Sequence, residues 1–383
     1  MKILHLASFT GNIGDNFNHL GFRSWFTKTT KIQPSWENLE IRDFYWKKKS
    51  YDHDFANYVN QFDLFVIGGG NYFEFWVETS PTGTSISIPT EVFQRIKIPI
   101  YFNSLGVDRH LGYSDSTFLK FNNFLKIINN NNKYLVTVRN DGAMETLQLL
   151  FDKSLFNNIY KVPDPAFYID NTNKKQHSYF FENQGLKILG INLASDMPDL
   201  RFCNFENNID DFAKEFADSL NFLMKNDESL FLVFIPHIFK DLEIISKVIS
   251  YINDDFRRKR IYVSEYGSGE EHSKNIYTLY EKCNLILGMR FHSNVIGLNL
   301  NKPTLGLFNY PQIHALYKDL EIDNFCIDLN SPNFSDKLIS QVEYFTKENF
   351  MYKENKSFKK INKLSEDAKE LLIKWLKLNN FNI

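Results

Sequence analysis

The stretch LILGMRFHSNVIGLNLNKPTLGLFNY, residues 285–310, decides the fold prediction. Its apolar run at 285–287 predicts a buried strand, a periodic segment predicts a helix, and a proline separates that helix from a second strand at 304–308. This order is typical of a parallel α/β sheet, and it places Arg290 and His292 at a strand's carboxyl end, beside a helix N-terminus. Ligands bind at that edge of such sheets, and helix amides there favour anions. The stretch contains no Asp or Glu that would oppose an anionic ligand.

Length and composition narrow the class of protein. A chain of 383 residues with 43% hydrophobic content favours two domains. The net charge of −2 gives no bulk reason to expect nucleic acid or an anionic membrane as a partner. Three widely spaced cysteines predict free thiols in a reducing compartment. With no apolar run of roughly 18 residues and no signal peptide, we expect a soluble, cytoplasmic protein without a transmembrane segment.

The N-terminal strand, residues 2–7, runs into a loop with Gly11 and Gly14 and then into a helix. Glycine lets backbone amides approach a phosphate, so this loop is one candidate for anion binding. A tight turn capped by Asp15 or Asn16 explains the same pattern about equally well.

Glycines and polar residues follow other predicted strands in the same way; they are Gly69, Gly70 and Asn71, then Asn103, then Arg139, and finally His237. Arg139 repeats the position of Arg290, at a strand end ahead of a helix. A structural bridge to a carboxylate is the alternative for each arginine, but two in equivalent places favour an anion site. His237 is either a hydrogen-bonded turn residue or an acceptor contact.

Strands and helices alternate in two halves separated by a polar segment at 171–184. The prediction is an α/β protein of two doubly wound, Rossmann-like domains facing a cleft, at residues 1–172 and 185–334. A helical tail is expected at 335–383. The arrangement resembles the GT-B architecture, which by itself selects no chemistry.

Together, several of these segments resemble the polysaccharide pyruvyl transferase family. The resemblance is carried by Gly11-Asn12-Ile13-Gly14-Asp15, Gly68-Gly69-Gly70, the strand end at 103–106, Val138-Arg139, Asp164-Pro165-Ala166-Phe167, Pro236-His237 and Gly288-Met289-Arg290-Phe291-His292. The first and last of these blocks, in this order and at this separation, are specific only together. The chain departs from the family's pattern at Asn140, at Ala143 and around Pro311-Gln312.

The resemblance implies transfer of a pyruvyl group from phosphoenolpyruvate to two hydroxyls of a sugar in a capsule, exopolysaccharide or cell-wall precursor, forming a cyclic ketal. Phosphoenolpyruvate would be the donor substrate, with no cofactor and no metal. We expect Arg139 and Arg290, from the two halves of a cleft lined with positive groups, to bind its two anionic groups. His292 is the expected proton carrier, and Asp15 is a second candidate base. The remaining expected contacts are Gly11, Asn12, Gly14 and Phe291 for the donor, and Gly69, Gly70, Asn71, Asn103 and His237 for the acceptor or the cleft.

Two other functions fit the same sequence. One is a GT-B-type glycosyltransferase that uses a nucleotide-activated, even acidic, sugar; the other is a non-catalytic polysaccharide-binding protein. The expected partners are phosphoenolpyruvate and a sugar or lipid-linked oligosaccharide, with no nucleic acid; peripheral membrane association is compatible with the sequence, and the oligomeric state is open. Arg290→Ala and His292→Ala are expected to abolish transfer with thermal stability nearly unchanged.

Overall fold

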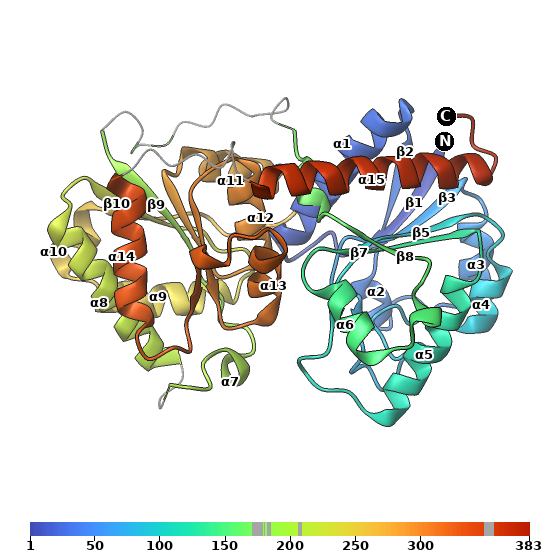
Figure 1. Ribbon diagram of the computed structural model, residues 1–383, viewed down its shortest axis with the longest axis horizontal. Coiled ribbons are helices and arrows are strands. Elements are labelled where there is room, and N and C mark those ends of the chain that lie inside the picture. Colours follow the sequence, from blue (N-terminus) through green and yellow to red (C-terminus); the bar gives the residue numbers. More distant parts are fainter. Residues whose placement is uncertain (171–178, 180, 182–184, 206–208, 348–355) are drawn as a thin grey trace. The chain divides into compact units, whose positions relative to one another are not determined.

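A computed structural model describes residues 1–170, 179, 181, 185–205, 209–347 and 356–383. The chain forms two compact units, which can be followed in Figure 1. The first unit contains Met1–Thr10, Asn18–Tyr168 and Lys360–Ile383, and the second contains Gly11–Phe17 and Ile169–Lys359. Each unit is built on a parallel sheet with helices, so the predicted α/β class with two doubly wound domains is confirmed.

In the described residues, the first unit's main sheet has six parallel strands in the order β2-β1-β3-β5-β7-β8. Their bounds are β1 Lys2–Ala7, β2 Ser35–Glu40, β3 Leu64–Gly68, β5 Ile100–Leu105, β7 Tyr134–Arg139 and β8 Ile159–Val162. The inner strands β3 and β5 are buried throughout and largely apolar, as expected where helices cover both faces. Because β2 lies on one side of β1 and the later strands on the other, the carboxyl ends of β1 and β3 form a topological switch point.

Helices cover the two faces of this sheet. They are α1 Ile13–Thr30, α2 Arg42–Tyr45, α3 His53–Val59, α4 Thr90–Arg95, α5 Asp115–Asn129, α6 Ala143–Leu150 and the C-terminal α15 Lys356–Leu378; the short segments β4 Phe73–Glu74, β6 Val107–Asp108, η1 Lys153–Leu155 and η2 Pro165–Tyr168 complete the unit. Phe22 and Phe26 of α1 form one core with Leu372 and Trp375 of α15. The second core, on the other face, includes side chains of α3 to α6.

The second unit's sheet likewise has six parallel strands in the part of the chain that the structure describes, in the order β11-β10-β9-β12-β13-β14. The strands are β9 Lys187–Asn192, β10 Leu230–Phe234, β11 Ile261–Val263, β12 Leu285–Gly288, β13 Thr304–Phe308 and β14 Cys326–Asp328. The helices are α7 Pro198–Arg201, α8 Ile209–Asn226, α9 Asp241–Tyr251, α10 Asp254–Lys259, α11 Glu270–Lys282, α12 Phe291–Asn299, α13 Pro311–Asp319 and α14 Phe334–Lys347, with the turn η4 Asp323–Phe325. Chain order reverses between β9 and β12, which makes their carboxyl ends the switch point.

The predicted linker at 171–184 lies mostly outside the described residues. Elsewhere the units divide the chain differently from the predicted domains at two places. The predicted tail at 335–383 is not one element, since α14 packs into the second unit's core and α15 into the first unit's. The segment Gly11–Phe17 packs with the second unit, although the rest of the N-terminal half belongs to the first. None of the helices in the described part of the chain combines the length and apolarity that a membrane span needs.

Candidate active site

The switch point of the second unit's sheet is organised by Asn192, the last residue of β9. Its side-chain amide donates to the carbonyl of Ile235, just beyond β10, at 2.8 Å, and its Oδ1 accepts from the backbone N–H of Arg290 at 2.9 Å. One buried side chain therefore joins the carboxyl ends of three adjacent strands. This fixes the backbone from which the Arg290 side chain projects, at the N-cap of α12.

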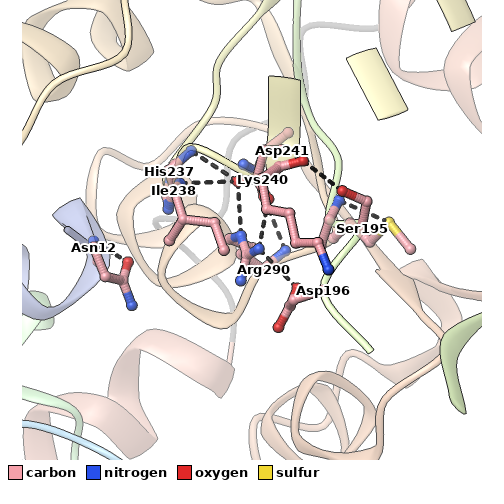
Figure 2. A network of polar contacts seen from close by, with 12 residues as sticks. Asn12, Ser195, Asp196, His237, Ile238, Lys240, Asp241 and Arg290 are labelled. Atoms are coloured by element: carbon pink, nitrogen blue, oxygen red, sulfur yellow. Dashed lines mark hydrogen bonds and ion pairs between the residues drawn. The ribbon is translucent and has the colours of Figure 1, made fainter. Parts of the chain in front are cut away.

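The Arg290 guanidinium lies against two carboxylates, as Figure 2 shows. Its Nε donates to Oδ2 of Asp241 at 2.8 Å, and its Nη2 donates to Oδ1 of Asp241 and, at 2.8 Å, to Oδ1 of Asp196. Burial alone would lower the pKa of Arg290, but the two carboxylates raise it. The prediction of a cleft lined with positive groups is therefore wrong around Arg290. Residues 285–310 contain no acid, but the fold places Asp196 and Asp241 from other segments beside Arg290.

Asp241 and Asp196 have further partners that hold the cluster rigid. Asp241, fully buried at the start of α9, also accepts the backbone N–H groups of His237 and Ile238 at 2.9 and 3.1 Å. Asp196 lies 3.4 Å from Nε of Arg201. Burial alone would raise the pKa of Asp196, but the two arginines hold it below its ordinary value. Two arginines thus balance two aspartates, and Nη1 of Arg290 donates to none of the described residues.

The N-terminal glycine loop packs onto this cluster within the second unit. Asn12 is the residue that caps α1, since its Oδ1 accepts the N–H of Gly14 at 2.9 Å. In the alternative of a capped turn, Asp15 or Asn16 was the candidate cap, but both lie inside α1, which begins at Ile13. The N–H of Ile13 donates to the carbonyl of His237 at 3.2 Å. Two amides of the expected phosphate loop are therefore already engaged. Asp15 lies half-buried in the first turn of α1.

Gly14 of this loop lies close to His292. A Cβ on Gly14 would lie 2.6 Å from Nδ1 of His292, a distance that a real side chain could not keep. His292 lies in the first turn of α12, nearly buried, with its ring 5.4 Å from that of Phe291. The structure thus brings Gly14 and His292 together within one unit, and Arg290 and Phe291 precede His292 at the start of α12.

His237 lies beneath the loop with no exposed surface. Its Nε2 shares a hydrogen bond of 2.7 Å with the Tyr280 hydroxyl, and its ring packs against Phe17. Burial first, and then the nearby Arg290 and two histidines, hold its pKa well below the ordinary value. In this structure His237 has the contacts of the turn histidine that was the alternative to an acceptor contact.

In the first unit, Arg139 ends β7 and is also paired with acids. Its Nε donates to Oδ2 of Asp141 at 2.5 Å, and its Nη1 lies 3.8 Å from Oδ2 of Asp164. The side chain is 4% exposed. Burial raises the pKa of Asp141 to about 6, although Arg139 opposes this. Both arginines therefore form the carboxylate bridges that were the alternative reading of each, and both still occupy strand ends.

The remaining predicted cleft residues surround β3 and β5 of the first unit. A Cβ on Gly69 would lie 2.5 Å from Oδ1 of Asn18, and one on Gly70 would meet the Tyr72 ring, so both glycines allow close packing of the turn. Asn71 donates to Oδ2 of Asp108 at 2.9 Å. Asn103 is buried, and its carbonyl accepts from the N–H of Gly69.

Sequence reasoning missed the residues that hold the arginines, namely Asn192, Asp196, Arg201, Asp241 and Asp141. Asn192 had a visible signal, because a polar residue ends an otherwise apolar strand. The others lie in loops or at helix ends, where polar residues are ordinary. No group of His, Cys, Asp and Glu side chains among the described residues could hold a metal ion.

Comparisons with known proteins identify a family. The model of the polysaccharide pyruvyl transferase family matches residues 11–310. A comparison with curated proteins finds no match.

Solved structures show the same fold at low identity. UDP-GlcNAc 2-epimerase from Neisseria meningitidis, bound to UDP-GlcNAc, is similar over 98% of this chain and 100% of that chain, with 13% identity and a TM-score of 0.58. S. aureus MnaA with UDP matches over 90% and 89%, with 12% identity and a TM-score of 0.55. The Methanocaldococcus jannaschii UDP-GlcNAc 2-epimerase matches over 91% and 94%, with 13% identity and a TM-score of 0.53. The shared fold is GT-B-like, and the likeness shows the fold alone.

Proposed function

The chain is a transferase of the polysaccharide pyruvyl transferase family, and we propose that it transfers the pyruvyl group of phosphoenolpyruvate to two hydroxyls of a sugar. The product would be a cyclic ketal on a capsule, exopolysaccharide or cell-wall glycan precursor. The observation that carries the proposal is the position of Arg290 and His292 at the second unit's switch point, where α12 begins.

Anion binding at this point rests on two kinds of donor. Nη1 of Arg290 is the guanidinium nitrogen left over from the carboxylate pairs, and the first amides of α12 carry the positive end of a helix dipole. Asp241 and Asp196 offset the arginine's charge but hold its orientation. Arg290 would thus act as a pre-oriented hydrogen-bond donor to a phosphate or carboxylate oxygen, rather than as a free cation.

The reaction moves one proton to carbon and one away from each hydroxyl. Protonation of the methylene carbon makes the adjacent carbon electrophilic, and the first sugar hydroxyl forms a C–O bond there as it loses its proton. The bond to phosphate then breaks, and the second hydroxyl closes the ring with loss of its own proton. One released proton replaces the one used at the methylene carbon, and the other leaves with phosphate. His292 is the proposed group that gives and takes these protons.

Among the other expected residues, Asp15 keeps its role in the proposal as a second base. Arg139 does not keep its role in donor binding, because its guanidinium is paired with Asp141 and Asp164 and its side chain is 4% exposed. Asn71 and Asn103 offer the amide groups that could bind acceptor hydroxyls. No cofactor beyond the donor substrate is proposed.

A nucleotide-sugar glycosyltransferase is the alternative. Its support is the fold shared with epimerases whose structures hold UDP or UDP-GlcNAc. The same anion-binding helix start would then hold a nucleotide phosphate.

The test is to incubate the purified protein with phosphoenolpyruvate and a panel of synthetic or lipid-linked glycosides, following phosphate release and the mass of the sugar. Phosphate release with a pyruvyl mass gain supports the proposal, and turnover only with nucleotide sugars supports the alternative. The key variant is His292→Gln, with His53→Gln, an exposed residue of α3, as the matched control. Loss of transfer of about 10²–10⁴-fold is expected for the first variant alone; equal activity of the two would remove His292 from the mechanism.

A further inference from the structure

An aromatic and basic segment of the first unit begins at the last residue of α2 and is exposed. It is Tyr45-Trp46-Lys47-Lys48-Lys49, here called the Tyr45–Lys49 knuckle. Tyr45 is 78% exposed and Trp46 is 50% exposed, and all three lysines are exposed. Single exposed aromatic residues are common on protein surfaces, but two adjacent ones followed by three lysines are not explained by chance exposure.

The knuckle has a defined conformation that keeps these side chains presented. The N–H of Trp46 donates to the carbonyl of Arg42, and the N–H of Lys48 donates to the carbonyl of Asp43, both at 2.8 Å. Lys47 adopts the left-handed conformation (φ 57°), which reverses the chain. Nζ of Lys48 lies 4.5 Å from the centre of the Trp46 ring. The aromatic and basic groups therefore form one compact surface rather than a disordered run.

We propose that the Tyr45–Lys49 knuckle docks the protein onto an anionic membrane surface. Tyr and Trp rings settle at the level of lipid headgroups, while lysines attract anionic lipids and extend their ammonium groups toward them. Between positions 42 and 49 there are four basic residues and one acid, Asp43. The attraction is local, because the chain as a whole carries a net charge of −2. With two aromatic rings and a basic cluster, the contact would be peripheral and reversible.

The position of the knuckle in the first unit relates membrane binding to the delivery of a lipid-linked sugar. It follows β2, and Arg42 links its base to the neighbouring strand, since Nε of Arg42 donates to Oγ of Ser8, just beyond β1, at 3.1 Å. The knuckle therefore lies at the carboxyl edge of the first unit's sheet, the edge that also carries Asn103 and Arg139. A membrane held there would present a lipid-linked sugar to that edge; this consequence rests on the proposed function, whereas membrane binding does not.

The experiment is co-sedimentation of the full chain, without substrates, with vesicles of phosphatidylcholine containing 30% phosphatidylglycerol and with pure phosphatidylcholine vesicles. The test variants are Trp46→Ala and the triple change Lys47→Gln/Lys48→Gln/Lys49→Gln. The matched controls are Phe222→Ala, an exposed aromatic residue of α8, and the triple change Arg257→Gln/Arg258→Gln/Lys259→Gln on α10, which removes the same charge.

Wild-type protein is expected to bind the anionic vesicles and not the neutral ones. At about fivefold per lysine, the knuckle triple variant should bind about 100-fold more weakly, and Trp46→Ala about tenfold more weakly; neither control should change binding. Equal losses in the α10 triple variant would mean that bulk charge alone is responsible, and would overturn the proposal. So would an absence of wild-type binding to the anionic vesicles. Because no substrate is present, failure here leaves the transferase proposal intact, and failure of pyruvyl transfer leaves vesicle binding interpretable.

Discussion

Replacing Arg290 by methionine is expected to destabilise the protein by about 3–5 kcal/mol near pH 8, the usual cost of removing one partner of a buried ion pair. The Arg290 side chain is 13% exposed, and it holds the fully buried carboxylate of Asp241 and the partly buried one of Asp196. Without the guanidinium, the fully buried carboxylate of Asp241 would lose its ion-pair partner, and Asp196 would keep only Arg201. The sequence-based expectation that Arg290→Ala leaves stability nearly unchanged is therefore replaced by its opposite.

The loss of stability caused by Arg290→Met should depend on pH in a definite direction. In the wild type, burial alone would raise the pKa of Asp196, but Arg290 and Arg201 hold it below its ordinary value, so Asp196 favours folding at all pH values above about 4. In the variant, burial is opposed by Arg201 alone and should raise the folded-state pKa of Asp196 relative to the wild type. Relative to the wild type, protonation of the carboxylate then stabilises the folded variant at low pH, and this stabilisation is lost as pH rises. The difference between variant and wild type should be largest near pH 8 and shrink toward pH 4.

The assay is urea unfolding followed by far-UV circular dichroism at several pH values. Arg257→Met is the matched control, because Arg257 makes only an exposed ion pair with Asp254 on α10 and should change stability by no more than about 0.5 kcal/mol. The double variant Arg290→Met/Asp241→Asn should recover part of the loss, since it removes one uncompensated charge and keeps an oxygen to accept the N–H of His237. A single Arg290→Met variant as stable as the control at pH 8 would refute the reasoning.

Three further outcomes are expected. Gly14→Ala should lower transfer activity and reduce the free energy of unfolding by about 1–3 kcal/mol, because the new Cβ would lie 2.6 Å from Nδ1 of His292. Transfer assays and urea unfolding check this, and an unchanged rate would contradict the close approach. Asp141, whose pKa burial raises to about 6, should make the free energy of unfolding fall as pH rises through that value, and Asp141→Asn should flatten this part of the stability profile. A thiol reagent should label exposed Cys203 in the native protein and leave Cys283 unlabelled until denaturant is added, because burial raises the Cys283 pKa to about 12; rapid native labelling of Cys283 would contradict its burial.

The sequence by itself determined the fold class and the positions of the main site residues. Apolar periodicity is local, so residues 285–310 correctly predict β12, α12 and β13. An arginine that follows an apolar strand must lie at the strand's carboxyl end, which placed Arg139 and Arg290. Short edge strands such as β8 and β14 were missed because three or four residues carry too little periodicity.

Only the tertiary structure decided what those residues contact. Asp196 and Asp241 reach Arg290 across 94 and 49 positions of sequence, because β9, β10 and β12 are neighbours in the sheet and end at the same edge. In the same way, the loop from Gly11 to Phe17 joins the second unit, because its amides and rings find partners there. Strand order and register are set by packing over the whole sheet, so no local pattern contains them.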